Sequence, residues 1–442
     1  MIPLVHLQNR AVQLSLGLAA AGLAVTVGLG LASESAGALS VAGGPATALG
    51  RLTGLVGTYL MLITVVLVAR LPALESVIGQ DRLVAWHRRL APWPLFLIAA
   101  HGVLIAVGYS QAARSGALQE LGVLLTTYPG VLAATVGFGL LAMAGVTSYR
   151  LARARMRHET WWAVHLYVYL GLALSFSHQL STGAAFIASP FARAWWISLW
   201  AGTAGLALVY RFGVPLWRSL YHRLRVVSIR YEGPGVVSIV CEGHRLDRLA
   251  VAGGQFLQWR FLVPGLWWQA HPYSLSALPT SSHLRVTVKV LGDHSGELAG
   301  LRSGTRVAIE GPYGAFTRHA RARDAVLLVG AGVGVTPVRA LLEDLPDHVD
   351  VEVVLRGSTA ESLVLDREVA ELVERRGGRL HRLVGPRSLI QLDQAALREL
   401  VPDVAERDVY VCGPASFSAS VERAARACGT PPGQVHQEAF AF

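Results

Sequence analysis

The stretch HRRLAPWPLFLIAAH, residues 87–101, runs from one histidine to another through a mainly apolar sequence. A second stretch, HLYVYLGLALSFSH, does the same over residues 165–178. Imidazole is rare at membrane depth, and it is also an axial ligand of haem iron. Histidine pairs on two apolar segments therefore suggest haem groups held between helices, although a packed histidine or a proton relay is the alternative for any single one.

The composition indicates a membrane protein. The chain has 442 residues, of which 52% are hydrophobic and 15% charged, and its mean hydropathy is +0.43. This is too apolar for an ordinary soluble protein of that length. Apolar runs of about 20 residues, the length that crosses a bilayer, recur in the first half. The six expected spans lie near Ala11–Leu31, Leu52–Leu71, Leu83–Val107, Val131–Ser148, Trp161–Leu180 and Trp195–Leu216.

Arginine placement predicts the orientation. A cleaved signal peptide is the alternative for the first segment, but its positively charged amino-terminal region is thin. With that segment uncleaved, nine arginines fall on one side and three on the other. The nine are Arg10, Arg70, Arg82, Arg88, Arg89, Arg150, Arg153, Arg155 and Arg157, and the three are Arg51, Arg114 and Arg193. The positive-inside rule then places the amino terminus and the C-terminal half in the cytoplasm, so the net charge of +10 requires no nucleic acid partner.

This topology sorts the histidines by depth. Both histidine-bearing segments run outward, so His87 and His165 lie toward the cytoplasm and His101 and His178 toward the exterior. At 1.5 Å per residue, the members of each segment are separated by about 20 Å along the helix. We interpret the two histidine pairs as the axial ligands of two haems, one toward each side of the bilayer. The 13 residues between His165 and His178 miss a common helix face by about 140°, and Pro92 and Pro94 interrupt the other segment.

The second half carries a pattern typical of flavin binding. An aromatic residue beside a hydroxyl residue at a strand edge stacks on a flavin ring and hydrogen-bonds its polar atoms, although such a tetrapeptide also occurs in ordinary turns. Further along, a strand delivers the single lysine of the chain to a Gly/Ser turn and a short helix, which suits a pyrophosphate. The candidate flavin-binding residues are His271, Pro272, Tyr273, Ser274, Lys289, Gly292 and Ser295.

A third pattern points to a nicotinamide nucleotide. A buried strand leads into a glycine-rich turn and a helix, where the backbone approaches a phosphate closely; the spacing is G-x-G-x-G, not the Rossmann G-x-G-x-x-G. The next strand ends in Arg356-Gly357-Ser358 instead of an acidic residue, which favours NADPH over NADH. Cys412 stands beside a second glycine turn, which favours a nicotinamide contact over an inert buried thiol. The candidate residues are Gly330, Gly332, Gly334, Thr336, Pro337, Arg356, Ser358, Cys412, Gly413 and Pro414.

In this order, the motifs resemble the ferric reductase and NADPH oxidase superfamily over nearly the whole chain. In that family, a haem-bearing six-helix domain precedes a ferredoxin-reductase-like FAD/NAD(P)H module. The resemblance implies that His87 with His165, and His101 with His178, bind two b-type haems. It also implies that the terminal Phe442 covers the flavin ring, so Phe442 and Cys412 are expected at the reacting rings. The Tyr-Ser choice at positions 273 and 274 is closer to soluble ferredoxin reductases than to oxidases.

We therefore expect a six-helix transmembrane haem-binding domain in residues 1–220, an antiparallel β-barrel FAD domain in 221–320 and a doubly wound α/β NAD(P)H-binding domain in 321–442. The expected activity is electron transfer from cytoplasmic NADPH or NADH, through FAD and two b-type haems, to an extracytoplasmic acceptor. A ferric or cupric chelate is the leading acceptor. The alternatives are dioxygen, which an oxidase reduces to superoxide, and a membrane or extracytoplasmic partner protein that the chain serves as a relay subunit.

Overall fold

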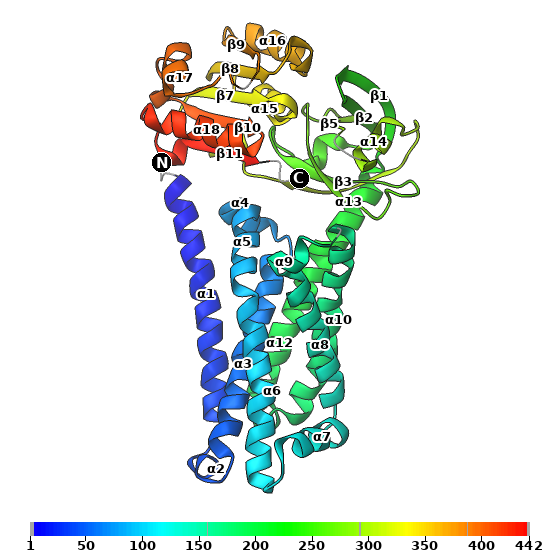
Figure 1. The fold of residues 1–442 in the computed structure, drawn as a ribbon, viewed down its shortest axis with the longest axis vertical. Coiled ribbons are helices and arrows are strands. Elements are labelled where there is room, and N and C mark those ends of the chain that lie inside the picture. The colour runs from blue at the N-terminus through cyan, green and yellow to red at the C-terminus, as the bar shows by residue number, and fades with distance from the viewer. Residues whose placement is uncertain (1–3, 157, 291–292, 387, 440–442) are drawn as a thin grey trace. The chain divides into compact units, whose positions relative to one another are not determined.

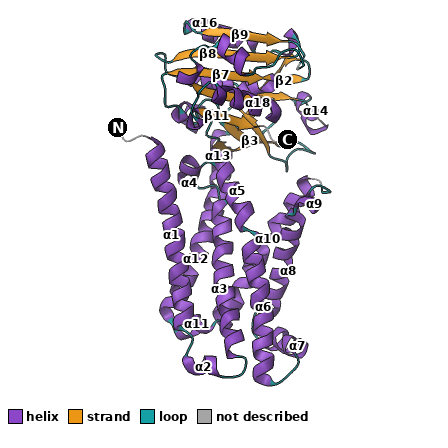
Figure 2. Cartoon of the chain, turned by 60° about the vertical axis from the view of Figure 1, so that its left-hand side comes forward, coloured by secondary structure: helices purple, strands orange, loops and turns teal. Residues whose placement is uncertain are grey.

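The computed structural model describes residues 4–156, 158–290, 293–386 and 388–439. The chain divides into two compact units, Met1–Phe212 and Gly213–Phe442. Within the described residues, the first unit is helical and the strands all belong to the second (Figure 1, Figure 2).

The first unit is built from long helices with short ones between them. The long helices are α1 (Leu4–Ala32), α3 (Gly44–Leu67), α6 (Pro92–Ala113), α8 (Val131–Ser148), α10 (His158–Thr182) and α12 (Pro190–Leu206). The 11-residue helix α5 (Gln80–Leu90) precedes α6, and a π-helical turn, Ala207–Gly213, follows α12. The short helices are α2 (Ala36–Ser40), α4 (Pro72–Ile78), α7 (Ala117–Thr127), α9 (Arg150–Arg153) and α11 (Ala184–Ala188).

Five helical segments of the described chain are long and apolar enough to cross a membrane. They are Val12–Ala32, Gly44–Leu67, Arg82–Ala113, Val131–Ser148 and Pro190–His222. Each overlaps one of the six expected spans. The remaining expected span lies inside α10, a 25-residue helix that is made more polar by His165, His178 and its serines.

The third expected span, helical from Arg82 to Ala113, carries a one-residue interruption at Ala91. Helix α5 ends at Leu90, and Pro92 occupies the first turn of α6. Proline is tolerated there because the first N–H groups of a helix have no intrahelical acceptor. His87 therefore lies on α5 and His101 on α6, so the ideal register of one continuous helix does not apply to this pair.

Small residues bring the helices of the first unit close together. A Cβ on Gly57 of α3 would lie 3.0 Å from the Leu97 side chain of α6, and a Cβ on Gly137 of α8 would lie 2.5 Å from the Gly171 carbonyl oxygen of α10. Helices in a membrane associate through such close contacts because no hydrophobic effect drives them together. Helix α6, which carries His101, is thus packed closely against α3. Helix α10, which carries His165 and His178, is packed closely against α8.

The second unit begins with α13 (Val214–His222) and two small antiparallel sheets. Their strands are β1 (Arg225–Gly233), β2 (Val236–Glu242), β3 (Phe256–Phe261), β4 (His271–Ser274), β5 (His283–Lys289) and β6 (Val307–Tyr313), and α14 (Asp293–Ala299) follows β5. The strand orders are β1-β2-β5 and β4-β3-β6. Isolated bridges, Leu275 to Val286 and Arg225 to Arg306, link the two sheets. The described strands thus form two three-stranded sheets. Their hydrogen bonding does not run continuously around the single β-barrel that the sequence predicts.

A five-stranded parallel sheet forms the rest of the unit, in the order β11-β10-β7-β8-β9. Its strands are β7 (Ala325–Ala331), β8 (Asp350–Gly357), β9 (Arg379–Val384), β10 (Asp408–Gly413) and β11 (Val435–Ala439), and its helices are α15 (Val335–Asp344), α16 (Asp366–Arg375), α17 (Gln394–Leu400) and α18 (Ala415–Ala427). Leu328 packs with Val338 of α15 in one core, and Leu327 packs with Val421 of α18 in another. Alternate residues of β7 therefore serve the two faces, which explains why the strand reads as a continuous apolar run.

An ion-pair network ties the small sheets to the parallel sheet. Arg285 of β5 donates from Nη1 and Nη2 to the carboxylate oxygens of Glu368 on α16, at 2.6 and 2.7 Å. Glu368 also accepts from Nε of Arg339 on α15 at 2.8 Å. Glu343 of α15 accepts from the backbone N–H of Leu278 at 2.8 Å. These charged hydrogen bonds, together with Val236 and Phe316 in the core of the parallel-sheet half, join the two halves of this unit.

Replacing Glu368 with glutamine is expected to destabilise this junction by about 1.5–3 kcal/mol, the range for hydrogen bonds to charged groups. Burial favours a raised pKa for Glu368, but the hydrogen bonds and charges of Arg285 and Arg339 outweigh it and hold that pKa below the usual range. The carboxylate therefore stabilises the fold above about pH 4.3, the pKa of the unfolded group, and that contribution is lost as the pH falls through the lower folded value.

The measurement is thermal release of flavin fluorescence from the full-length chain across a pH series. The difference between the native chain and Glu368→Gln is expected to be constant near neutral pH and to vanish in acid. Glu371→Gln, on the same helix, is the control. A Glu368→Gln difference that persists unchanged in acid would contradict the charged role of this side chain.

Candidate electron-transfer site

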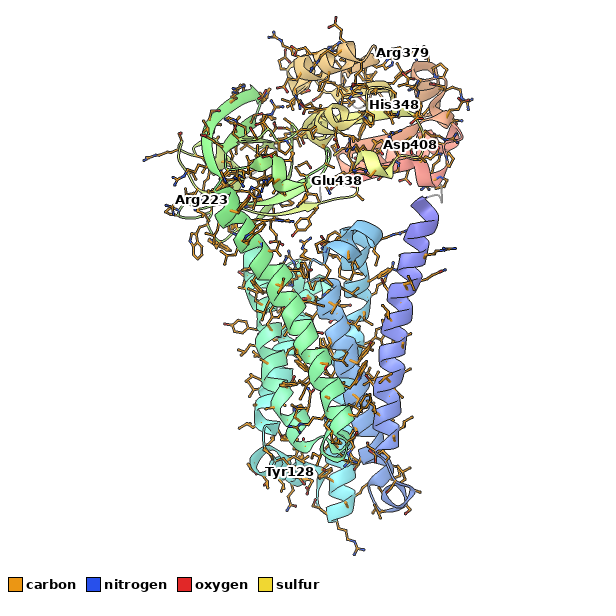
Figure 3. All side chains as sticks on the ribbon, turned by 180° about the vertical axis from the view of Figure 1, so that it is seen from behind. Tyr128, Arg223, His348, Arg379, Asp408 and Glu438 are labelled. Atoms are coloured by element: carbon orange, nitrogen blue, oxygen red, sulfur yellow. The ribbon has the colours of Figure 1, made fainter. Side chains whose placement is uncertain are left out.

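His101 and His178 line one cavity in the first unit. The cavity has a volume of about 770 Å³ and mainly apolar walls, drawn chiefly from α3, α6, α8 and α10. That volume lies in the range of small-molecule and cofactor sites. Tyr128, labelled in Figure 3, belongs to the same lining. The structure thus brings together the two histidines that the arginine pattern assigned to the same depth.

The His101 ring is held by α3. Its Nδ1 lies 2.8 Å from the Gly50 carbonyl oxygen, which accepts a hydrogen bond from the Nδ1–H tautomer. Nε2 makes no hydrogen bond to a described residue, so it is the nitrogen left for a ligand. A Cβ on Gly54 would lie 2.7 Å from Nδ1, so any larger residue at position 54 would displace the His101 ring. Metal-bound histidines usually have this arrangement, with one ring nitrogen on a carbonyl and the other on the metal.

His178 is positioned by the start of α8. Gly130, which precedes α8, has φ +80, and a Cβ there would lie 2.8 Å from Ser177 Oγ and 3.0 Å from the His178 backbone nitrogen. The His178 Nδ1 is buried and has no hydrogen bond of normal geometry to the described residues. A buried imidazole nitrogen without such a partner is costly and points to a group that the protein chain does not itself supply.

The rings of the second pair, His87 and His165, lie beside each other. Their ring centroids are 6.3 Å apart, with an angle of 72° between the planes. His87 Nδ1 lies 2.9 Å from the Thr64 carbonyl oxygen, again leaving Nε2 for a ligand. His165 stacks on Trp161, with centroids 5.1 Å apart, and its Nδ1 lies 3.3 Å from Ser148 Oγ. Because metal–imidazole bonds are about 2 Å long, rings at this separation leave room for one metal ion between them.

The donor sets fit haem iron. Each pair offers two imidazoles from different helices, and at least one ring of each pair has its Nδ1 on a backbone carbonyl. The apolar walls around His101 and His178 suit a porphyrin, and the Gly54 gap is a cradle that a Cβ would fill. The sequence alone did not indicate Gly50, Gly54 or Thr64. The spacing Gly50-x-x-x-Gly54-x-x-Gly57 was the available signal, since it places small residues on one side of a helix.

Replacing Gly54 with alanine is expected to lower haem content at the His101 pair and to slow acceptor reduction by about 10–100-fold, the effect of losing an outer-shell partner. The new Cβ displaces the imidazole and breaks its bond to Gly50. Gly139→Ala, on α8, is the control, because a Cβ at Gly139 meets no atom within 4 Å and Gly139 does not line the cavity. Haem content and a reduced-minus-oxidised spectrum are the measurements. Equal spectra and rates for both variants would contradict the role given to Gly54.

The predicted flavin motif lies on β4 beside β3. Tyr273 pairs with Leu257 and Ser274 with Phe256 in the antiparallel register. Ser274 is buried, and its Oγ has no hydrogen-bond partner in the described chain. His271 and Tyr273 stack, with ring centroids 5.8 Å apart, and burial raises the pKa of Tyr273 to about 12, so its hydroxyl is a neutral donor. Pro272 is exposed at the same edge. An unsatisfied buried hydroxyl beside an aromatic ring fits a flavin.

The predicted pyrophosphate segment is described only in part. Lys289 is exposed at the end of β5, where it pairs with Val236 of β2. Gly292 lies outside the described residues, and Ser295 lies in α14.

The two glycine turns of the nucleotide motif meet at one edge of the parallel sheet. Gly330 of β7 pairs with Cys412 of β10. A Cβ on Gly334 would lie 2.3 Å from the Cys412 carbonyl oxygen, and one on Gly413 would lie 3.0 Å from the Ala331 side chain. Gly332 has φ +57, a left-handed conformation that favours glycine. The close approach leaves backbone groups of both turns at the carboxyl ends of the strands, where α/β sheets bind nucleotides.

Cys412 is fully buried at this edge. Burial raises the pKa of its thiol well above the usual value, and the charge of Glu438 raises it further. The side chain is therefore a neutral thiol at physiological pH, suited to contact a ring and not to act as a thiolate. Pro414 precedes α18.

The residues expected near a 2′-phosphate lie at the end of β8. Arg356 pairs in register with Ala331, lines a small hollow with Gly330 and Gly332, and donates from Nη2 to the Gly385 carbonyl at 2.8 Å. Ser358 is exposed. Further residues of the turn have structural roles: Thr336 Oγ1 donates to the Val333 carbonyl at 2.9 Å, and Pro337 is buried. Phe442 lies outside the described residues.

Three family models match the chain. A ferric reductase like transmembrane component matches residues 53–176, an FAD-binding domain matches residues 223–317, and an oxidoreductase NAD-binding domain matches residues 328–423.

Curated relatives match about half of the chain. The chain is 27% identical to an NADPH oxidoreductase of Mycobacterium tuberculosis, over 51% of this chain and 62% of that protein. It is 30% identical to a flavohemoprotein of Bacillus subtilis, over 42% of this chain and 51% of that protein. The match thus spans only about half to three fifths of each relative. The FAD/NAD-binding domain of a nitric oxide dioxygenase from Vibrio cholerae is 26% identical, with a TM-score of 0.44 over 50% of this chain and 98% of that domain.

The chain thus combines a ferric reductase-like transmembrane region with an FAD-binding domain and an oxidoreductase NAD-binding domain. The order of these domains is the ferric reductase/NADPH oxidase-type architecture that the motifs indicated. This architecture supports electron transfer driven by NAD(P)H.

Proposed function

We propose that the chain transfers electrons from NAD(P)H, through FAD and two b-type haems, to a ferric or cupric chelate on the opposite side of the membrane. The observation that carries this proposal is the pairing of the four histidines: His101 and His178 share one cavity, and the His87 and His165 rings lie 6.3 Å apart. The description of the family model that matches residues 53–176 favours ferric iron as the acceptor.

Bound FAD supplies the conversion of hydride transfer into single-electron transfer, and bound haem supplies one-electron carriers. The chain holds and orients these groups. We assign the flavin ring to Tyr273 and Ser274, and its pyrophosphate to Lys289, Gly292 and Ser295. His271 and Pro272 complete the strand edge. We also propose that α10 is a sixth membrane span and that the two small sheets enclose the flavin as a barrel does.

The nucleotide is assigned to the two facing glycine turns, with Cys412 and Phe442 at the ring. Arg356 and Ser358, at the end of β8, support NADPH as the preferred nucleotide, because a guanidinium and a hydroxyl suit a 2′-phosphate and no carboxylate stands there to bind a ribose 2′-OH. The arginine count places the amino terminus and the second unit in the cytoplasm.

The charge at the mouth of the His101 cavity is largely neutralised. Arg51 lines the cavity, but its Nη1 lies 3.1 Å from Glu34 Oε1. Steering of an anionic chelate by Arg51 alone is therefore weak.

The test uses the purified full-length chain in nanodiscs, supplied with NADPH or NADH. Ferric chelate reduction is followed without oxygen, and superoxide is followed in air. Reduction of the chelate, preceded by a low-spin b-type haem signal, is the expected result. Superoxide formation with no chelate reduction would identify an oxidase. Haem reduction without either product, until a membrane fraction is added, would identify a relay subunit. Absence of a haem spectrum overturns the proposal.

A further inference from the structure

Two apolar side chains project into solvent from the loop that joins β3 to β4. Leu262 is 44% exposed and Trp267 is 61% exposed. The loop, residues 262–268, is held in shape by the buried Leu266 and by hydrogen bonds from the N–H groups of Leu266 and Trp267 to the Val263 carbonyl, at 3.1 and 3.0 Å. We call it the Trp267 loop. These contacts hold the Trp267 loop in a defined turn that presents its tryptophan to solvent.

The Trp267 loop lies at the edge where the chain leaves α13. The Leu262 N–H donates to the Arg306 carbonyl at 2.9 Å, and the Val307 N–H donates to the Leu224 carbonyl at 2.9 Å. Arg225 forms a bridge with Arg306. Leu224 is two residues beyond the end of α13, so the loop, the start of β6 and the end of α13 form one edge.

Helix α13 indicates where lipid ends. It closes the apolar segment Pro190–His222, and its exposed residues include Leu216, Trp217 and Leu220. Trp217 stacks on Tyr221, with ring centroids 5.1 Å apart. Tryptophan and tyrosine concentrate at the headgroup level of a bilayer. Leu224 follows Trp217 by seven residues, a rise of about 10 Å, so the edge lies roughly one Debye length from that level.

The same edge is strongly basic. Its exposed arginines are Arg223, Arg225, Arg302 and Arg306. Arg223 is labelled in Figure 3 at the end of α13, and the Arg302 carbonyl closes the turn that leads to β6 by accepting from the Thr305 N–H at 3.1 Å. None of the four forms an ion pair with a described residue. Glu297 is an acidic residue near the loop. A Cβ on Gly265 would lie 3.4 Å from its carboxylate.

We propose that this edge is a second membrane contact, in which Trp267 and Leu262 insert among anionic lipid headgroups and the four arginines bind their phosphates. Exposed tryptophan and leucine next to arginine are the chemistry of an anionic lipid surface. The contact fixes the flavin-binding strands beside the end of the last membrane helix. This inference requires only that α13 reaches the membrane surface, so it does not depend on the haems or on the acceptor.

The test is the depth of spin labels on the full-length chain in nanodiscs. Cys241 and Cys412 are buried, so Cys428→Ser removes the one partly exposed thiol. Labels are placed by Leu262→Cys and Trp267→Cys, with Tyr231→Cys as the matched control, because Tyr231 is 73% exposed on β1 of the same pair of sheets. Collision with oxygen, which partitions into lipid, is compared with collision with a water-soluble nickel chelate.

In nanodiscs that contain phosphatidylglycerol, the ratio of oxygen to nickel collisions is expected to be several-fold higher at positions 262 and 267 than at 231. The increase is expected to shrink in pure phosphatidylcholine and in the double variant Arg302→Glu, Arg306→Glu. A ratio equal to that at 231 places the loop in water and overturns the proposal. Exclusion of both reagents in either lipid shows that protein covers the loop, which also overturns it.

A second measurement avoids the substitutions. Hydrogen exchange of the unlabelled chain is compared in the two kinds of nanodisc. Slower exchange across residues 262–268 with phosphatidylglycerol is the expected result, and identical exchange in both lipids counts against the contact. Both experiments are read without turnover, so a failed electron-transfer assay leaves them interpretable.

Discussion

Replacing His101 with leucine is expected to remove one of two haems and to lower acceptor turnover by more than about 100-fold, since loss of an outer-shell partner alone costs 10–100-fold. Flavin reduction by NADPH is expected to continue, because the flavin and nucleotide residues all lie in the second unit. The physical reason is direct: leucine fills the space of an imidazole but has no nitrogen for the iron.

The matched variant is His101→Met. Methionine is also an axial haem ligand and raises the reduction potential, so it is expected to restore haem content with a shifted midpoint potential. A merely structural role of His101 would make leucine the better replacement in this apolar cavity. Haem content, midpoint potential and anaerobic acceptor reduction are measured. Full acceptor turnover in His101→Leu would remove His101 from the electron path.

Replacing Gly334 with alanine is expected to slow flavin reduction by NADPH by about 100-fold, as a displacement of roughly 1 Å in a reacting geometry does. The new Cβ would lie 2.3 Å from the carbonyl oxygen and 2.6 Å from the carbonyl carbon of Cys412. Both are backbone atoms of β10, which is hydrogen-bonded on both sides, so the glycine turn must move away from the nucleotide edge.

Gly433→Ala is the control, because a Cβ there meets no atom within 4 Å. Stopped-flow flavin reduction is measured without oxygen, with FAD content determined in parallel. Reduction of haem by dithionite is expected to stay normal, which separates a nucleotide defect from unfolding. A Gly334→Ala rate within twofold of the native rate at equal FAD content would show that this turn does not position the nucleotide.

The histidine register shows where sequence reasoning reached its limit. The 13 residues from His165 to His178 predict opposite faces of one helix, which argues against two similar sites. In the structure, His87 and His101 lie on separate helices, divided near Ala91. His165 lies beside His87 of α5, and His178 shares a cavity with His101 of α6, so each histidine of α10 meets its own partner. Pro92 signalled the break, but its effect on ring direction depends on packing between helices.

The hydrogen-bond acceptors that hold the two histidine rings could not be predicted from the sequence either. The Gly50 and Thr64 carbonyls that hold His101 and His87 are backbone atoms, and backbone atoms leave no trace in residue identity. By contrast, the glycine turns at Gly330–Gly334 and Gly413 were found because a close backbone approach demands glycine in the sequence itself.

The sequence by itself determined the two-part architecture, the pairing of the histidines by depth and the order of the cofactor motifs. These follow from local properties: apolar run length, arginine asymmetry and residue types that suit a given chemistry. Only the tertiary structure decided which nitrogen of His101 and His87 is left for a ligand, which glycine makes room for an imidazole, and how Arg285 joins the two halves of the second unit. Those features arise from contacts between residues far apart in the chain, and the spacing of residues in the sequence does not say which distant residue each one meets.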